Sequence, residues 1–314
     1  MKNFVLTVTL NPAVDEIFKV KKHRTAPGWI LGEQRSCAGG KGINVARALT
    51  RLGTPVVATG LLGGITGQFI VEELRREKIK NDFVSCCDPT RTNVTILDVS
   101  RNTMNRLMED GAPLCRPDLE KFKKKFKALL KKSSWVVLSG RIPGGTAETI
   151  YRDLLHLARR ENVKTFLDSH GRAFSLGLQA KPLFIKPNSE ETQHLLRQRL
   201  NSLEKLKKAI RYFLRRDIPY VFVTLGAKGA LASDGRGLWL ARPPQIKCVN
   251  AVGCGDAFIA GFIAAFEKPK DFLAAFRLAV AAGTANALGL QPGAIHKNIV
   301  HKIAQQVKIE ALKF

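Results

Sequence analysis

The segment from Asn250 to Phe262 places two glycines and an aspartate just ahead of an apolar run. Gly253 and Gly255 allow a tight turn in which the backbone approaches a ligand closely. The apolar run predicts a helix, and the N–H groups of its first turn lack intrahelical partners and can bind an anion. Asp256 stands beside this anion site, where the ordinary alternative is an N-cap carboxylate. Because phosphoryl transfer needs a base next to an anion site, the segment indicates that chemistry.

A second glycine-rich segment runs from Ala38 to Leu49. Its glycines precede an amphipathic pattern, so a helix is predicted whose backbone approaches a small ligand, with Lys41 and Asn44 as further donors. The segment is not a Walker A loop, because Gly40-Lys41 is followed by glycine rather than by serine or threonine. Taken alone, it does not identify a ligand.

Apolar runs that predict buried strands alternate with helical patterns along most of the chain. The strands are expected at 4–10, 56–60, 135–138, 164–167, 183–185 and 221–225, and the helices between them at 42–52, 67–78, 117–132, 147–160, 189–199 and 202–215. This alternation predicts an α/β fold with a parallel sheet covered on both faces. Beyond residue 255 the pattern is helical, at 256–266, at 269–288 and from 295 into the region of 302.

Two pairs of short strands interrupt the alternation, 15–20 with 31–37 and 92–99 with 103–108. Each pair follows a core strand, so the four strands are predicted to form a small lid over the carboxyl edge of the sheet, where α/β proteins bind ligands. No internal repeat or low-complexity linker is visible. We therefore predict a single domain, 1–314, with lid segments at about 13–37 and 90–110.

The charge balance indicates an anionic ligand. Lysine and arginine outnumber aspartate and glutamate by 51 to 26, which gives a formal net charge of +25. No apolar run reaches the roughly 20 residues of a membrane span, and the N-terminus lacks a secretory signal. The six cysteines are scattered without a Cys-x-x-Cys motif, so reduced thiols and a cytoplasmic location are predicted.

The basic run 121–132 could bind nucleic acid or a membrane surface. However, Phe122, Phe126, Leu129 and Leu130 recur at helical spacing, so the lysines are expected on the solvent face of a core-packed helix. We therefore expect neither a membrane nor a nucleic-acid partner.

Six motifs occur in an order that resembles the PfkB (ribokinase-like) carbohydrate kinase family over essentially the whole chain. They are Thr9-Leu10-Asn11-Pro12-Ala13-Val14-Asp15, Gly39-Gly40-Lys41-Gly42-Ile43-Asn44-Val45-Ala46, Ser139-Gly140-x-Ile142-Pro143, Lys186-Pro187-Asn188-x-x-Glu191, Thr224-Leu225-Gly226-x-x-Gly229 and Gly253-x-Gly255-Asp256. The first two are most similar to the 1-phosphofructokinase and tagatose-6-phosphate kinase branch. The resemblance implies a ribokinase-like three-layer α/β sandwich with a mostly parallel sheet and a small β lid.

The resemblance also implies roles for individual residues. Asp256 is implied as the general base, with the N–H groups of 252–255, including Gly253, Cys254 and Gly255, on the transferred phosphoryl group of ATP. The residues implied in acceptor binding are Asp15, Gly39, Gly40, Lys41 and Asn44. Those implied in nucleotide and phosphate binding are Lys186, Asn188, Glu191, Thr224, Gly226, Gly229 and Asn286, with Glu191 associated with Mg²⁺. For Asn286 a helix-surface amide is an equally good interpretation, and for Asp15 and Asn44 the alternative is a turn-forming side chain.

This sequence departs from the family pattern in two places. Relatives usually carry a basic residue in the first lid segment, where this chain has Gly28-Trp29-Ile30-Leu31-Gly32. Conversely, Arg141 replaces a serine in the Ser-Gly-Ser-Leu-Pro motif. Because arginine binds phosphate bidentately, Arg91, Arg106 and Arg141 are candidates for the missing contact.

The resemblance and the charge together predict an ATP- and Mg²⁺-dependent kinase of a phosphorylated ketohexose. Fructose 1-phosphate, converted to fructose 1,6-bisphosphate, is the first candidate acceptor, followed by tagatose 6-phosphate or fructose 6-phosphate. The apolar stretch 29–31 leaves an unphosphorylated sugar or a nucleoside as an alternative. A non-catalytic sugar-phosphate or nucleic-acid binding protein on the same fold is a different class, against which Asp256 and its adjacent glycines argue. A homodimer through the lid is a further expectation.

Overall fold

The computed structural model describes residues 3–22, 28–101, 103–267 and 269–314. In these residues the main element is an eleven-stranded sheet with the order β15-β14-β13-β12-β11-β10-β9-β1-β4-β5, in which β6 also pairs with β4. Its strands are β1 (Phe4–Thr9), β4 (Val56–Leu62), β5 (Lys80–Asn81), β6 (Val84–Ser85), β9 (Ser133–Ser139), β10 (Lys164–Asp168), β11 (Phe184–Ile185), β12 (Tyr220–Thr224), β13 (Ala230–Ser233), β14 (Leu238–Arg242) and β15 (Lys308–Leu312). The strands from β5 to β12 in this order pair in parallel, and β13, β14 and β15 add an antiparallel edge.

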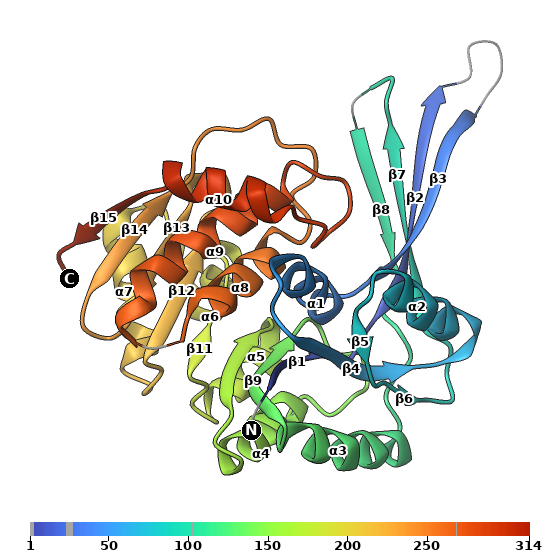
Figure 1. Ribbon diagram of the computed structural model, residues 1–314, viewed down its shortest axis with the longest axis horizontal. Coiled ribbons are helices and arrows are strands. Elements are labelled where there is room, and N and C mark those ends of the chain that lie inside the picture. The colour runs from blue at the N-terminus through green and yellow to red at the C-terminus, as the bar shows by residue number, and fades with distance from the viewer. Residues whose placement is uncertain (1–2, 23–27, 102, 268) are drawn as a thin grey trace.

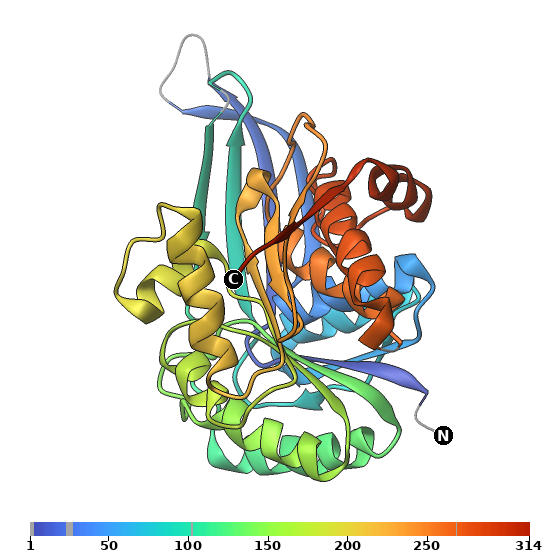
Figure 2. The same ribbon diagram turned by 90° about the vertical axis from the view of Figure 1, so that its left-hand side faces the viewer.

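Helices cover both faces of this sheet, as Figures 1 and 2 show. They are α1 (Lys41–Leu52), α2 (Gly64–Arg76), α3 (Arg116–Leu130), α4 (Ile150–Arg160), α5 (Gly171–Leu178), α6 (Ser189–Leu196), α7 (Leu203–Leu214), α8 (Cys254–Ala265), α9 (Phe272–Asn286) and α10 (Lys297–Gln306), with short 3₁₀ turns at Gly226–Lys228 and Pro269–Asp271. Alternate residues of one strand enter two separate cores: Trp135 and Val137 pack with α1, α8 and α9, whereas Val136 and Leu138 pack with α3, α4 and α7. This alternation is what a sheet buried on both faces requires.

The helix that carries Asp256 is anchored by stacked aromatic rings. Phe166, Phe184 and Phe222 lie side by side on β10, β11 and β12, and Phe262 of α8 packs across them at ring distances of 4.8 to 6.4 Å. Such contacts fix α8 against the sheet, because large buried rings tolerate little displacement. The start of α8 is thereby held at the carboxyl edge of the parallel strands.

A second sheet projects from the body as a lid (Figure 1). Its strands are β2 (Ala13–Lys22), β3 (Trp29–Gly39), β7 (Arg91–Asp98) and β8 (Thr103–Met108), in the order β3-β2-β7-β8. Within each predicted pair the strands are antiparallel, and β2 joins β7 in parallel. The predicted lid is therefore confirmed.

The sequence pattern did not reveal the antiparallel edge of the main sheet. The helices predicted at 256–266, at 269–288 and from 295 into the region of 302 are followed by a strand that was not predicted, β15, which pairs with β14. The side chains of β15 are only partly buried or exposed, so its residues carry no apolar run that would predict a strand. None of the helices among the described residues has the length and apolar character of a membrane span.

Candidate active site

The conformation of the turn before α8 is fixed by a glycine and by hydrogen bonds from the Asn286 side chain. Gly253 has φ of +82°, and a Cβ at this position would lie 2.6 Å from Pro292 Cβ. Asn286, at the end of α9, donates from Nδ2 to the Val252 carbonyl oxygen at 2.8 Å and accepts the Gly293 N–H at 2.7 Å. Asn286 is buried, so its interpretation as a helix-surface amide is wrong. Its amide instead fixes the loop that leads into the helix start.

Asp256 lies in the first turn of α8 with its carboxylate buried. Asn44 of α1 donates from Nδ2 to Asp256 Oδ2 at 2.9 Å. Burial, together with the neighbouring Asp168, raises the pKa of Asp256 to about 6, although Lys41 and the hydrogen bond from Asn44 oppose the rise. A carboxylate with this pKa is ionised at neutral pH yet basic enough to accept a proton from a bound hydroxyl group.

Two lysines flank a second carboxylate, Asp168, at the end of β10. Lys41 Nζ lies 3.2 Å from Asp168 Oδ2, and Lys186 Nζ lies 3.0 Å from Asp168 Oδ1. Burial alone would raise the pKa of Asp168, but the ammonium groups of Lys186 and Lys41 hold it at about 2. A Cβ on Gly255 would lie 3.0 Å from Lys186 Nζ. The two lysines therefore place ammonium groups beside the start of α8, where anions are favoured, while Asp168 balances part of their charge.

Sequence reasoning missed Asp168, although a signal was present. The residue follows the apolar run of β10 directly, and the carboxyl ends of parallel strands are where α/β proteins gather ligand-binding groups. A polar side chain that ends a buried strand is thus a candidate in its own right.

The Asn-x-x-Glu motif forms a capping box at the start of α6. Asn188 Oδ1 accepts the Glu191 N–H at 2.7 Å, and Glu191 Oε2 accepts the Asn188 N–H at 2.8 Å. This reciprocal pair satisfies two backbone donors of the helix end. The other carboxylate oxygen, Glu191 Oε1, lies 3.7 Å from Lys41 Nζ, on the side of the two-lysine cluster. Asn188 also lies next to Thr224, with which it forms a β-bridge.

The glycines after β12 occupy a tight turn. Gly226 and Gly229 both have positive φ, and a Cβ on Gly229 would lie 1.9 Å from the Ala241 carbonyl oxygen on β14. Backbone packing by itself explains why position 229 is glycine. The turn follows Thr224 at the same edge as Asn188, so Asn188, Thr224, Gly226 and Gly229 lie together. Asn286 lies instead beside Val252 and Gly293.

The other half of the site lies at the base of the lid. Asn93 of β7 donates from Nδ2 to Asp15 Oδ1 at 2.7 Å. A Cβ on Gly39 would lie 2.1 Å from Asp15 Oδ2, so only glycine fits beside this carboxylate. Gly40 has φ of +119° and begins α1. Burial raises the pKa of Asp15, although Asn93, Arg106 and Arg91 oppose the rise. Asn93 was not predicted, because its meeting with Asp15 depends on strand register.

A cavity separates the lid from the loop before α8. Its lining is formed by Asp15, Ile17, Cys37, Thr95, Leu97, Met104 and Arg106 of the lid and by Val249, Asn250, Val252, Leu290 and Pro292 of the body. We call it the acceptor cavity. It joins the Asp15 side of the site to the backbone turn that precedes Asp256.

Comparison with known proteins identifies the family of the chain. The model of the pfkB family carbohydrate kinases matches residues 8–297. The chain belongs to this family. A tagatose-6-phosphate kinase from Staphylococcus epidermidis is 32% identical over 308 residues, covering 97% of this chain and 99% of that protein. The predicted family and the predicted phosphotransferase class are confirmed.

Solved PfkB-type structures share the fold. Phosphofructokinase-2 from Escherichia coli matches with a TM-score of 0.89 at 25% identity, covering 98% of this chain and 99% of that one. Structures of that enzyme include a complex with fructose-6-phosphate and a tetrameric inhibited form. A Thermotoga maritima protein described as a possible 1-phosphofructokinase matches with a TM-score of 0.85 at 28% identity, covering 99% of this chain and all of that one. The chain is thus a sugar-phosphate kinase of the PfkB family, with the predicted ribokinase-like fold.

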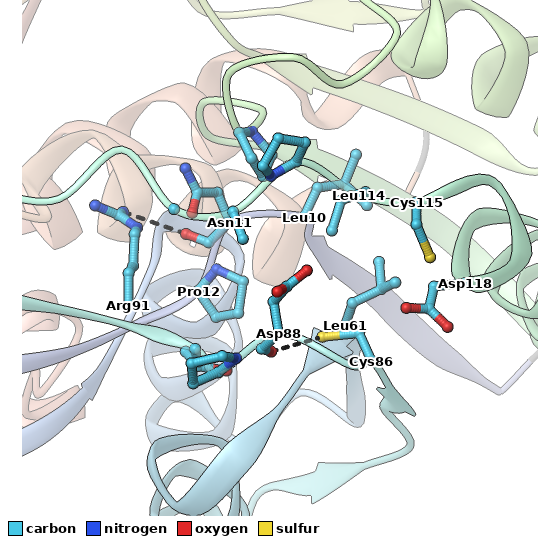
Figure 3. Close-up of a pocket in the computed structure, with 16 residues that line it drawn as sticks. Leu10, Asn11, Pro12, Leu61, Cys86, Asp88, Arg91, Leu114, Cys115 and Asp118 are labelled. Atoms are coloured by element: carbon cyan, nitrogen blue, oxygen red, sulfur yellow. Dashed lines mark hydrogen bonds between the residues drawn. The ribbon is translucent and has the colours of Figure 1, made fainter.

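In this PfkB kinase, Arg91 is held by the protein itself. Its guanidinium donates to the Glu109 carbonyl oxygen at 2.7 Å, to Asn93 Oδ1 at 2.9 Å and to the Asn11 carbonyl oxygen at 3.3 Å. Figure 3 shows Arg91 and Asn11 at one end of a cleft, with Asp118 at the other. Because Asp88 and Asp118 both line this cleft, it does not suit a phosphate group.

Arg141 and Arg106 are less constrained. Arg141 pairs with Asp110 at 2.6 Å, and both side chains are exposed. Arg106 lines the acceptor cavity close enough to Asp15 to lower the pKa of that carboxyl. An exposed ion pair is weak and exchanges readily, so the Arg141 guanidinium remains available to an anionic ligand, and the Arg106 side chain is itself exposed.

Proposed function

We propose that the protein transfers the γ-phosphate of ATP to a hydroxyl group of a ketohexose monophosphate, with fructose 1-phosphate and then tagatose 6-phosphate as the leading acceptors. The observation that carries this proposal is the buried Asp256 carboxylate, with its pKa near 6, beside the two-lysine cluster at the start of α8. A base next to lysine side chains that can contact phosphate oxygens is what in-line phosphoryl transfer requires. The similarity to tagatose-6-phosphate kinase supports the acceptor class.

In the proposed reaction the acceptor hydroxyl lies against Asp256 Oδ1, because Oδ2 already accepts from Asn44. The hydroxyl oxygen forms a bond to the γ-phosphorus as the bond from that phosphorus to the bridging oxygen of ADP breaks. The hydroxyl proton passes to Asp256 and from there to solvent. The N–H groups at the start of α8, together with Lys186, stabilise the charge on the transferred group. Asp15 orients the acceptor from the lid side.

The residues present fit a magnesium ion held jointly with the nucleotide. Among the residues that the structure describes, no cluster of three or more histidine, cysteine, aspartate or glutamate side chains could hold a metal alone. Glu191 Oε1 is free of the capping box and faces the two-lysine cluster, and one carboxylate with phosphate oxygens and water is the usual arrangement for Mg²⁺. Bound there, Mg²⁺ would neutralise part of the triphosphate charge.

The acceptor's own phosphate is proposed to contact Arg106 and Arg141. We expect Arg106→Ala and Arg141→Ala to lower kcat/KM for the preferred hexose phosphate by about 10- to 100-fold, the usual loss for a charge-assisted hydrogen bond. Coupled ADP detection over fructose 1-phosphate, tagatose 6-phosphate, fructose 6-phosphate, free fructose, ribose and a nucleoside, with Mg²⁺ or excess EDTA, measures both acceptor and metal requirement.

Arg242→Ala is the matched control, since Arg242 forms an exposed pair with Glu310 at the far edge of the sheet. It should leave all rates unchanged. A much higher kcat/KM for an unphosphorylated sugar or nucleoside than for every hexose phosphate would refute the acceptor assignment.

The lid supports the proposal of a homodimer. More than half of the surface is exposed at four apolar residues of this small sheet, Trp29, Leu31, Leu107 and Met108, and at Val99 in the turn after β7. Exposed apolar groups of this density are characteristic of interaction surfaces. We expect sedimentation velocity to give twice the mass of one chain, and Leu107→Glu to produce monomers. Ile65→Glu, at an exposed apolar side chain of α2, should remain dimeric; a monomeric wild type would contradict the proposal.

A further inference from the structure

Arg47 of α1 is the largest fully buried side chain of the described residues, with 1% of its surface exposed. Its guanidinium contacts four acceptors from different segments. Nε donates to Glu77 Oε2 at 2.5 Å, one terminal nitrogen donates to Asn44 Oδ1 at 3.1 Å and to the Pro292 carbonyl oxygen at 2.8 Å, and the other donates to the Ala38 carbonyl oxygen at 2.8 Å. Arg47 touches none of the reacting groups of the proposed mechanism, yet two hydrogen bonds in series, through Asn44, connect it to Asp256.

The contact with Asn44 has a directional consequence. An asparagine amide can present either its oxygen or its NH₂ group in a given direction, whereas a guanidinium only donates. Arg47 therefore requires that Asn44 point its Oδ1 atom toward the guanidinium, and the Asn44 NH₂ group then faces Asp256. The reversed amide would set its oxygen against the Asp256 carboxylate, which has no proton to share when ionised.

We propose that Arg47 is a positioning residue for phosphoryl transfer: it holds the Asn44 amide so that Nδ2 donates to Asp256 Oδ2, which leaves Asp256 Oδ1 for the acceptor proton. The inference rests on the proposed role of Asp256 as the base. The remaining Arg47 bonds to the end of β3 and to the loop after α9 keep the guanidinium immobile. Glu77, at the end of α2, compensates its buried charge.

The test is a double-mutant cycle of Arg47→Lys and Asn44→Ala, in which kcat is measured as a function of pH for each variant. Lysine keeps the charge beside Glu77 but lacks the planar fork that reaches several acceptors at once. We expect Arg47→Lys to lower kcat about tenfold, to leave KM for ATP unchanged, and to move the acid limb of the kcat profile upward by about half a pH unit. Asn44→Ala should move the acid limb upward by about one pH unit. The double variant Asn44→Ala with Arg47→Lys should show the same shift as Asn44→Ala alone.

The other groups that face Asp256 are the same in every member of this cycle. They are Lys41 on α1, Asp168 at the end of β10, Lys186 after β11 and Cys254 on α8 itself. Arg51→Lys, one turn further along α1 at an exposed position, is the control and should match the wild type.

Three outcomes would overturn the inference. If Arg47→Lys shifts the acid limb equally in the wild type and in Asn44→Ala, Arg47 does not act through the Asn44 amide. A lowered Tm with an unmoved acid limb would make Arg47 purely structural. If Arg47→Lys does not fold, Glu77→Gln replaces it, because loss of the buried charge partner loosens the same guanidinium; an unmoved limb there counts equally against the inference. An acid limb that persists in Asp256→Asn would instead refute the base itself.

Discussion

Asp256→Asn is expected to lower kcat by about 10³- to 10⁴-fold while KM for ATP stays close to that of the wild type. The amide retains the shape of the carboxylate and can still accept from Asn44, but it cannot take the acceptor's proton. Stopped or coupled assays of ADP release at pH 8 measure the loss. Asp217→Asn, at an exposed aspartate paired with Lys181, should keep full activity and serves as the control.

The pH dependence provides a second readout of the same substitution. Because the base must be ionised, wild-type kcat/KM should rise with pH through about 6 and then level off. The limb should be absent from the residual activity of Asp256→Asn. Ordinary turnover in a folded Asp256→Asn protein would exclude this carboxylate as the base.

Asp256→Asn, which lowers activity, should not lower the thermal stability of the protein at pH 8. Burial raises the pKa of Asp256 above its unfolded value of 3.8 to about 6. Such a group stabilises the fold below its unfolded pKa, and this contribution is lost as pH rises through the folded pKa, so at pH 8 the ionised carboxylate is a cost. Asparagine carries no such cost. The Tm of Asp256→Asn at pH 8 should therefore equal or exceed that of the wild type, which separates lost chemistry from lost folding.

The layered core was predictable because its physical rules act over short stretches of sequence. The run 135–138 is apolar throughout since Trp135 and Val137 enter one core while Val136 and Leu138 enter the other. Phe122 and Phe126 recur at helical spacing because one face of α3 is buried. An exposed edge strand shows neither a continuous apolar run nor apolar residues at helical spacing, so β15 was not predicted.

The charged contacts of the site could not be predicted from local sequence. Lys41 meets Asp168 across 127 positions, Asn44 meets Asp256 across 212, and Arg47 meets Pro292 across 245. Only the folded topology places these residues together. The family motifs identified Lys41 in the first contact and both Asn44 and Asp256 in the second. They did not reveal Asp168 or Arg47. Arg91 illustrates the converse: the motif pattern made it a candidate phosphate ligand, but local sequence did not show that its guanidinium donates to the carbonyl oxygens of Glu109 and Asn11.

The two glycines before Asp256 look equivalent in the sequence but differ in the structure. A Cβ on Gly255 would meet only the end of the Lys186 side chain at 3.0 Å, which can move. A Cβ on Gly253 would lie 2.6 Å from Pro292 Cβ, in a backbone with φ of +82°. Any side chain at 253 must therefore displace either the start of α8 or the loop braced by Asn286.

Gly253→Ala is accordingly expected to lower kcat by about 10²- to 10³-fold, the loss typical when a donor to a transferred group is misplaced, whereas Gly255→Ala should lose about tenfold or less. Gly235→Ala is the matched control, because Gly235 also has φ of +82° but its Cβ would meet nothing closer than 3.6 Å. The backbone strain is thus the same in both variants. Equal kcat for Gly253→Ala and Gly235→Ala, measured at matched folded fractions, would show that the turn at 253 does not hold the phosphoryl group.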